Sequence, residues 1–196
     1  MKIIMATSNK DKVNEIRQML SGTDIEIVSL KEAGVSIDID ENGSSFEENA
    51  SIKANAVRDL TGQMAISDDS GLVIDYLDGA PGIYSSRFMG EDTPYSEKNA
   101  AILEKLQGVP DELRSARFVC SMAIVYPDGH TRTVQGTMEG RIAHEIAGEG
   151  GFGYDPIFFL PEKGCTSAQL TAAEKNAISH RGKALEQLVK ILSLQR

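Results

Sequence analysis

Tryptophan is absent from the 196 residues of the chain, and cysteine, histidine and proline are scarce, with 2, 3 and 6 residues. The two cysteines, Cys120 and Cys165, are far apart in the sequence, which argues against a disulfide-stapled scaffold and favours free thiols in a reducing compartment. We therefore expect a cytoplasmic protein. No two of the three histidines stand at the spacing of zinc ligands, and this excludes a His/Cys zinc site.

Long hydrophobic runs and an excess of positive charge are also missing. No apolar stretch approaches the roughly 18 residues of a membrane span, and residues 1–7 lack the character of a signal peptide, so we expect neither a membrane anchor nor export. The chain carries 20 Lys and Arg against 29 Asp and Glu, a formal net charge of -9. Such a field repels nucleic-acid polymers and acidic membranes, whereas a small anion can bind where a few cations or a metal ion converge.

The remaining composition, 41% hydrophobic and 25% charged, is that of an ordinary globular chain. A hairpin of two long strands interrupts an otherwise alternating order of helices and strands. We therefore expect one domain over residues 1–196, of the α/β class, with a mixed, strongly twisted central sheet flanked by helices. The predicted strands are 2–6, 25–30, 35–40, 64–67, 72–77, 116–126, 131–143 and 157–160. The predicted helices run from the turn at 7–9 to Gly22, from Ser45 to about Leu60, from about Tyr95 to Leu106, and onward from about Arg181.

The polar segment 7–12 lies where a strand passes into a helix. Free backbone N–H groups and the positive end of the helix dipole favour a phosphate there, and Lys10 and Lys12 add charge. On the pattern alone, a helix cap by Ser8 or Asn9 with solvated lysines is the more common explanation. The segment is not a P-loop, because no Gly-Lys-Ser/Thr occurs in the chain.

Two acidic segments could bind a hard cation. The segment 68–71, Asp-Asp-Ser-Gly, lies between two apolar strands, and its carboxylates could hold Mg²⁺ or accept a proton from water. An ordinary turn explains these residues equally well. In the run 38–41, alternation places Asp38 and Asp40 on one face of a strand, where they could add a ligand, although such a run is usually a solvated edge.

Three further segments carry groups suited to a ligand. Asn49 and Lys53 are four residues apart and project from one face of a helix, although a lone lysine there is usually solvated. The loop 148–156 contains Gly-x-Gly-x-x-Gly but precedes a strand, so it is not a dinucleotide fold; its two aromatic residues suit a flat ligand better than a flexible surface loop. The segment 174–181 gathers Lys, His and Arg near a helix start, where they could meet an anion or base oxygens, or simply flank a capped helix.

Six segments in this order resemble the ITPase/RdgB-like family of XTP/dITP pyrophosphatases: 6–12, 46–50, 68–72, 79–87, 150–156 and 178–181. The resemblance runs through nearly the whole chain. It implies a homodimer of α/β subunits with a cleft between two lobes. It also implies Mg²⁺-dependent hydrolysis of deaminated purine nucleoside triphosphates (ITP, dITP and XTP) to the monophosphate and pyrophosphate, which removes them from the nucleotide pool.

The resemblance also implies roles for individual residues. Asp69 is the expected proton acceptor and a metal ligand, with Asp40 or Glu41 as the second ligand. Lys175, His180 and Arg181 are expected to close on the base and its neighbouring phosphate. The other expected substrate contacts are Thr7, Ser8, Asn9, Lys10, Asp11, Lys12, Lys53 and Ser70 for the phosphate side, and Phe152, Gly153, Tyr154 and Asp155 for the base pocket, with Phe152 stacking.

Two other functions remain open at this level. A Maf-like pyrophosphatase, which resembles this family in fold, would act on modified pyrimidine or methylated guanine nucleotides. A nucleotide-binding sensor would bind without turnover. For a pyrophosphatase of deaminated purines, hydrogen-bond donors facing the six-position oxygen would disfavour adenine, because its amine leaves each donor unpaired.

Overall fold

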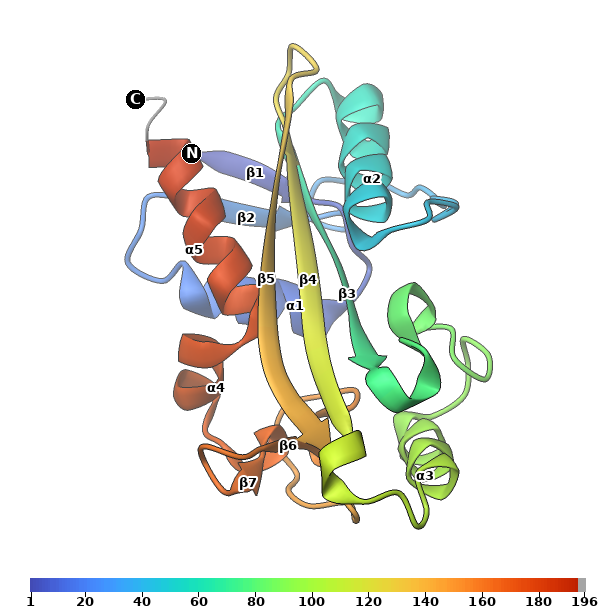
Figure 1. Ribbon diagram of the computed structural model, residues 1–196. Helices are drawn as coiled ribbons and strands as arrows, with labels where there is room; N and C mark the ends of the chain where they lie inside the picture. Colours follow the sequence, from blue (N-terminus) through green and yellow to red (C-terminus); the bar gives the residue numbers. More distant parts are fainter. Residues whose placement is uncertain (194–196) are drawn as a thin grey trace. The chain divides into compact units, whose positions relative to one another are not determined.

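A computed structural model describes residues 1–193, and the last three residues of the predicted domain lie outside this range (Figure 1). The helices are α1 (Lys10–Met19), α2 (Phe46–Thr61), α3 (Tyr95–Lys105), α4 (Ala172–Ile178) and α5 (His180–Ser193). The strands are β1 (Lys2–Met5), β2 (Glu26–Ser29), β3 (Ala65–Ile74), β4 (Ser115–Val125), β5 (Thr131–Ile142), β6 (Phe158–Leu160) and β7 (Cys165–Thr166). The α/β class is confirmed.

The seven strands form one mixed sheet in the order β2-β1-β3-β4-β5-β6-β7. β1 pairs in parallel with both β2 and β3, whereas β6 pairs antiparallel with both β5 and β7. The predicted hairpin of β4 and β5 is present, and its turn is closed by the backbone N–H of Tyr126, which donates to the His130 carbonyl at 2.9 Å. A mixed sheet follows because the short turn forces these neighbours to run antiparallel.

The chain forms two compact units. Unit 1 comprises residues 1–69, 120–136 and the segment from His180 onward, and unit 2 comprises residues 70–119 and 137–179. In unit 1, alternation along the strands turns Ile3 and Met5 towards α1 and α5, and Ile4 and Ala65 towards α2. Helices therefore cover both faces of this part of the sheet.

Unit 2 has its own core, which α3 covers. Ile102 of α3 and Leu106, which caps the end of that helix, pack with Leu72 of β3 and Phe158 of β6. The buried Arg114 fixes the end of this helix, because its guanidinium donates to the carbonyls of Leu106 at 2.7 Å and Val109 at 3.3 Å. It also donates to the carbonyls of Ile142, the last residue of β5, and of Ala143, which follows it. A charged side chain thus satisfies the carbonyl of Leu106, which caps α3, and that of Val109 in the segment beyond it.

The predicted strand 35–40 is wrong. The segment is extended, and Ile37 and Ile39 pack against the α2 face while Asp38 and Asp40 are exposed, but the structure assigns it no strand pairing within residues 1–193. Alternation reports which side chains are buried, and it does not require a hydrogen-bonded neighbour.

The predicted turn at 68–71 is also wrong, because β3 continues from Ala65 to Ile74 without a break. The strand can bury two acidic residues since helices bring cations to them, as described below. The helix α4 and the short strand β7 were not predicted. Thr171 and Glu174 form a capping box at the start of α4, and this Thr-x-x-Glu pattern is the sequence signal that could have identified it.

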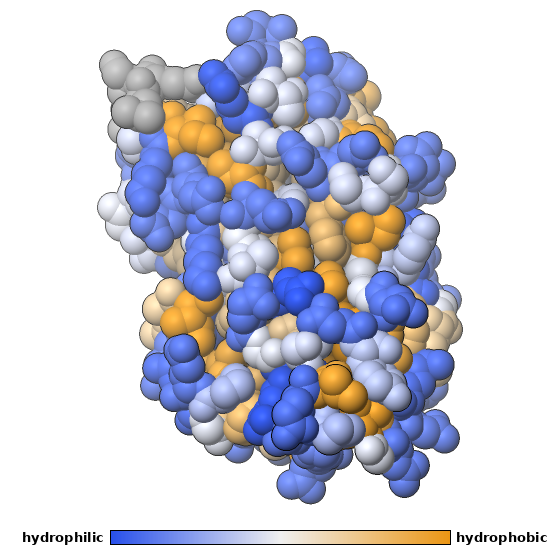
Figure 2. Space-filling view, viewed as in Figure 1, coloured by the Kyte–Doolittle hydropathy of each residue, from blue (hydrophilic) through white to orange (hydrophobic). Residues whose placement is uncertain are grey.

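The face in Figure 2 is mostly hydrophilic, with apolar residues in small separate groups. This distribution agrees with the two interior cores. Among residues 1–193, no helix combines the length and the apolar character that crossing a membrane requires.

We predict that Leu188→Ala lowers the free energy of unfolding by about 2–5 kcal/mol, because Leu188 is 1% exposed and its loss leaves a cavity between α5 and the sheet. Leu60→Ala is the matched control, since Leu60 is 58% exposed on α2, and it should change stability by less than about 0.5 kcal/mol. Urea denaturation of both variants measures the difference. Equal losses would contradict the assignment of Leu188 to the core.

Candidate active site

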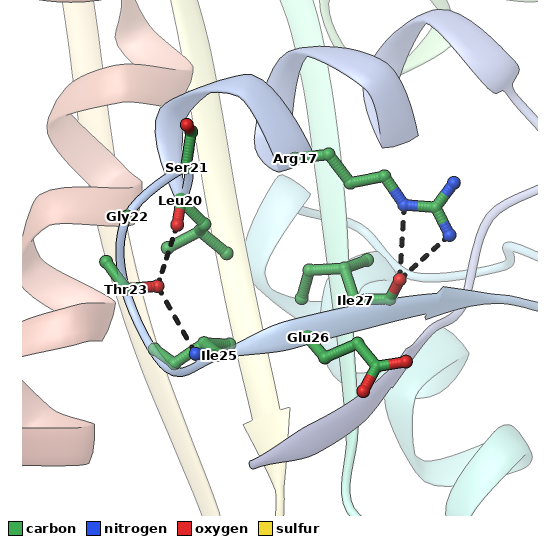
Figure 3. A pocket seen from close by; sticks show the side chains of 8 residues that line it. All are labelled: Arg17, Leu20, Ser21, Gly22, Thr23, Ile25, Glu26 and Ile27. Atoms are coloured by element: carbon green, nitrogen blue, oxygen red, sulfur yellow. Dashed lines mark hydrogen bonds between the residues drawn. The ribbon is translucent and has the colours of Figure 1, made fainter.

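The hollow between α1 and β2, of about 330 Å³, contains none of the predicted site residues (Figure 3). Its polar side chains instead stabilise the local backbone. Arg17 donates to the Ile27 carbonyl through Nε at 3.1 Å and Nη2 at 2.8 Å, and Thr23 Oγ1 donates to the Leu20 carbonyl at 2.8 Å. The hollow is therefore part of the packing between α1 and β2. The predicted site residues lie elsewhere, in three clusters of side chains.

The first cluster, which we call the Asp69 cluster, consists of Glu41, Asn49, Lys53 and Asp69 in unit 1. Lys53 Nζ lies 3.1 Å from Asp69 Oδ1 and 2.9 Å from Glu41 Oε2, so one ammonium group bridges two carboxylates. Asn49 Nδ2 donates to the other oxygen of Asp69 at 3.3 Å. Because Asn49 and Lys53 are one turn apart on α2, one helix face contacts both oxygens of Asp69.

Burial controls the electrostatics of the Asp69 cluster. Burial raises the pKa of Asp69, and the opposing charges of Lys53 and Lys12 do not cancel this effect. Burial alone would lower the pKa of Lys53, but the charges of Asp69, Asp68 and Glu41 outweigh it and raise the pKa. Asp69 is therefore a more basic carboxylate than an exposed one, beside a lysine that stays protonated.

Oxygen ligands and negative charge make the Asp69 cluster suitable for a hard divalent cation. Glu41 and Asp69 supply two carboxylates, and both already contact one positive charge. Asp40 is exposed, whereas Glu41 lies on the inner side of the extended segment with Ile37 and Ile39. Within residues 1–193, no group of three or more His, Cys, Asp or Glu side chains is placed to hold a metal. Substrate oxygens and water would have to complete the coordination.

The second cluster, which we call the Asp68 cluster, consists of Lys12, Glu15, Asp68 and Arg181, also in unit 1. Asp68 and Asp69 are adjacent in a strand, so their side chains point to opposite faces of the sheet. Asp68 Oδ2 accepts from Arg181 Nε at 3.2 Å and Nη2 at 3.1 Å, and lies 3.0 Å from Lys12 Nζ. Arg181 Nη1 donates to Glu15 Oε2. The two carboxylates therefore cannot chelate one cation side by side, contrary to the prediction from their adjacency.

Arg181 is 2% exposed and its charge is fully engaged within the protein. Burial by itself would lower its pKa, but Asp68 and Glu15 among its neighbours outweigh burial and raise the pKa. His180 precedes it at the start of α5 and is 5% exposed. The donors of Arg181 thus face Asp68 and Glu15, whereas the predicted contact of His180 with a ligand stays a prediction.

In the segment 7–12, Asn9 caps α1. Its side-chain oxygen accepts from the backbone N–H groups of Asp11 at 2.9 Å and Lys12 at 3.3 Å. The helix-cap interpretation is therefore correct for Asn9. The accompanying expectation of solvated lysines holds for Lys10, which is exposed, but not for Lys12, which pairs with Asp68. Thr7 is half-buried, and Ser8 and Asp11 are exposed.

The third cluster, which we call the Asp155 cluster, consists of Phe152, Asp155, Ser167 and Lys175 in unit 2. Asp155 Oδ2 accepts from the backbone N–H of Phe152 at 2.8 Å and from Lys175 Nζ at 2.6 Å, and Oδ1 accepts from Ser167 Oγ at 2.7 Å. Lys175 Nζ also lies 4.9 Å from the centre of the Phe152 ring. A Cβ at Gly151 would lie 2.1 Å from Asp155 Oδ2, and its φ of +69° favours glycine as well. The loop is thus held by a buried carboxylate.

The two aromatic residues of this loop have different environments. Phe152 is half-buried, whereas Tyr154 is 3% exposed and packs edge-to-face against Tyr95, with ring centres 5.1 Å apart. The Tyr154 hydroxyl donates to the Ser85 carbonyl at 2.7 Å, and burial raises the pKa of that hydroxyl. Asn99 of α3 donates to the Gly153 carbonyl at 3.1 Å. Tyr154 therefore packs in the core, and Phe152 has the ring that a ligand can reach.

The structure brings some predicted residues together and separates others. Lys53 contacts both Glu41 and Asp69. Lys12 and Arg181 both contact Asp68, and Lys175 contacts both Asp155 and the Phe152 ring. Ser70 follows Asp69 in β3 and is half-buried. Sequence reasoning missed the site contacts of the following residues: Glu15, Asn99 and Ser167. Their partners are distant in sequence, so no local spacing identifies them. The i, i+4 spacing with Lys53 was the signal for Asn49.

Comparisons with known proteins identify the relatives of this chain. The model of the Ham1 family matches residues 3–191. The "dITP/XTP pyrophosphatase" of Desulforamulus reducens is 47% identical over 193 residues, which cover 98% of this chain and 96% of that protein. The protein of the same name from Bacillus subtilis is 47% identical over 189 residues, 96% of each chain.

Solved structures give the same relationship. The Staphylococcus aureus Ham1 protein superimposes with a TM-score of 0.89 at 37% identity and covers 100% of both chains. A structure described as a nucleoside-triphosphatase or dITP/XTP pyrophosphatase from Mycobacterium abscessus gives a TM-score of 0.77 at 42% identity, covering 96% of this chain and 98% of that one. From the family model and these full-length relatives, we conclude that the chain belongs to the Ham1 family.

Proposed function

We propose that this protein is a dITP/XTP pyrophosphatase that hydrolyses deaminated purine nucleoside triphosphates (dITP, ITP and XTP) to the monophosphate and pyrophosphate. Its nearly full-length relatives carry the name dITP/XTP pyrophosphatase. The single observation that carries the chemistry is the Asp69 cluster, in which a buried lysine and two carboxylates lie together. Such a group suits the hydrolysis of a phosphoanhydride, where charge has to be neutralised and water activated.

The Asp69 cluster is the proposed centre of hydrolysis. Mg²⁺ held by Asp69 and Glu41 would neutralise phosphate oxygens when bound. Glu41 is the better second ligand than Asp40, because it already reaches the cluster. Asp69, whose pKa is raised by burial, takes the proton of the attacking water. Lys53 keeps its charge beside that carboxylate and stabilises the phosphate oxygens.

The N-terminal end of α1 is the proposed binding site for the rest of the triphosphate. Lys12 follows the Asn9 cap, so its charge adds to the positive end of the helix dipole. Thr7 and Ser8 precede this cap and, with Lys10, supply further donors, whereas the Asp11 carboxylate at the same helix end can only accept. Arg181 is proposed to act through Asp68, whose carboxylate it shares with Lys12. It is in this sense a positioning residue.

The Asp155 cluster is the proposed site for the base. The Phe152 ring offers a stacking face, and Lys175 lies beside it as a donor for the six-position oxygen of hypoxanthine or xanthine. Asp155 fixes both groups, because it accepts from the Phe152 backbone and from Lys175. His180 begins α5 in unit 1, and its contact with the substrate stays a prediction from the family resemblance. Adenine carries an amine at this position and would leave the lysine donor unpaired.

We also propose an oligomeric state and a cellular location for the protein. The family resemblance supports a homodimer, which sedimentation of the purified protein tests. The free thiols of Cys120 and Cys165 suit the cytoplasm, where the nucleotide pool lies. Fractionation of cells that express the chain would check this location.

We predict that dITP and XTP release pyrophosphate at kcat/KM values about 10–100-fold above that for dATP, because one unpaired donor costs about 1–3 kcal/mol. Excess EDTA should abolish the release, and added Mg²⁺ should restore it. A panel of standard, deaminated and modified nucleotides measures both effects. Faster hydrolysis of UTP, dTTP or a methylated guanine nucleotide would support the Maf-like alternative. Full activity in excess EDTA would contradict the proposed requirement for a metal ion.

We predict that Asp69→Asn lowers kcat for dITP by about 10²–10⁴-fold, because the amide cannot accept the proton of water. Binding of dITP should persist, since Lys53 and the segment 7–12 remain. Steady-state kinetics and calorimetric titration separate the two properties. Unchanged turnover would contradict the role of Asp69 as proton acceptor, and binding without turnover in the unmodified protein would indicate a sensor.

We predict that Lys175→Ala raises KM for dITP about 10-fold or more and lowers kcat less, because the lost contacts with the base and with Asp155 serve binding. Lys163→Ala is the control, since Lys163 is exposed in the same unit, and it should leave both constants unchanged. A fall in kcat with an unchanged KM would instead place Lys175 in the transition state.

A further inference from the structure

The extended segment that carries Glu41 is held against the first turn of α2 by three side-chain contacts. Asn49 Oδ1 accepts from the backbone N–H of Gly43 at 2.8 Å, and Glu48 Oε2 accepts from that of Ser44 at 2.7 Å. Ser45 Oγ caps the helix by accepting from the Glu48 N–H at 3.1 Å. Gly43 is two residues from Glu41, so its attachment restricts where that carboxylate can lie.

The contacts of Asn49 determine the orientation of its amide. The Gly43 N–H can only donate, so it requires the oxygen of the amide, and the nitrogen must then face Asp69. Asn49 is 0% exposed, so water does not compete for either group. One buried amide therefore connects the segment of one candidate metal carboxylate to the side chain of the other.

Gly43 makes this connection possible. A Cβ at position 43 would lie 2.7 Å from Asn49 Oδ1, 2.8 Å from Glu48 Cβ and 3.0 Å from the Asn49 backbone nitrogen. Two of these neighbours belong to the rigid first turn of α2, so the extended segment would have to move away. Such a shift would carry Glu41 with it and change its separation from Asp69.

We propose that Asn49 and Gly43 together form a positioning device that holds the Glu41 carboxylate beside Lys53 and Asp69, where one divalent cation would meet both carboxylates. This inference rests on the metal site of the proposed function. Neither residue coordinates the metal; the amide and the missing Cβ set the geometry of the groups that do. Outer partners of this kind commonly change metal affinity by about 10–100-fold when they are removed.

The test is Mn²⁺ binding by the full chain without nucleotide, followed from the electron paramagnetic resonance signal of free Mn²⁺. Asn49→Leu and Gly43→Ala should each weaken binding about 10-fold or more. The double variant should lose little beyond the larger single loss, because the two changes break one connection. Asn55→Leu is the matched control on the same helix, since Asn55 contacts Ser51 and Arg58 and not Asp69, and it should bind as the unmodified chain does.

Circular dichroism and thermal unfolding of each variant separate positioning from loss of fold. If Asn49→Leu does not fold, Gly43→Ala, which keeps every side-chain contact group, carries the test alone. A lowered melting temperature with unchanged Mn²⁺ affinity in both variants would overturn the positioning role. Absence of Mn²⁺ binding by the unmodified chain, both alone and with a non-hydrolysable dITP analogue present, would instead overturn the proposed metal site, so the two failures are distinguishable.

Discussion

The architecture of unit 1 depends on two consecutive buried carboxylates in β3. Asp68 is 0% exposed and Asp69 7% exposed, and successive residues of a strand face opposite sides of the sheet. Burial of a carboxylate without a partner is strongly unfavourable, so each side needs its own cations. Lys12 and Arg181 meet Asp68 on one face, and Lys53 meets Asp69 on the other. The helices that cover the sheet are thus also the source of the charges that make the strand possible.

The separation of the two carboxylates also separates their tasks. Among residues 1–193, Asp69 has one buried cation in direct contact, and burial raises the pKa of Asp69, which suits a group that has to accept a proton. Asp68 shares one oxygen between two cationic side chains and thereby organises them. The two carboxylates differ because their neighbours differ. A turn that placed both of them on one side of the sheet would have given them similar surroundings and removed this difference.

Unit 2 shows how a glycine-rich loop can be well ordered. Asp155 fixes both groups of the proposed base site, because it accepts from the backbone N–H of Phe152 and from the ammonium group of Lys175. Tyr154 anchors the loop in the core through its hydroxyl and its contact with Tyr95. The half-buried Phe152 is then presented by a loop whose conformation is fixed beforehand, and preorganised groups of this kind lose little freedom when a ligand binds.

Much of the fold follows from local patterns. Apolar periodicity and caps identify α1, α2, α3, α5 and the hairpin, because each of these depends on neighbours within a few residues. The same reasoning misread 35–40 as a strand and 68–71 as a turn. Whether an extended segment pairs, and whether acidic residues can be buried, depends on partners from elsewhere in the chain.

The candidate site, like the fold, was predictable from the sequence only in part. The sequence by itself determined the family, the residue types and the neighbouring positions of Asn49 and Lys53 on one helix face. The tertiary structure alone decided that Glu41 rather than Asp40 reaches Lys53, and that Arg181 is neutralised by Asp68, 113 residues away. The physical reason is that charge pairing and burial are set by distances in space, and a pattern of residues along the chain does not contain those distances.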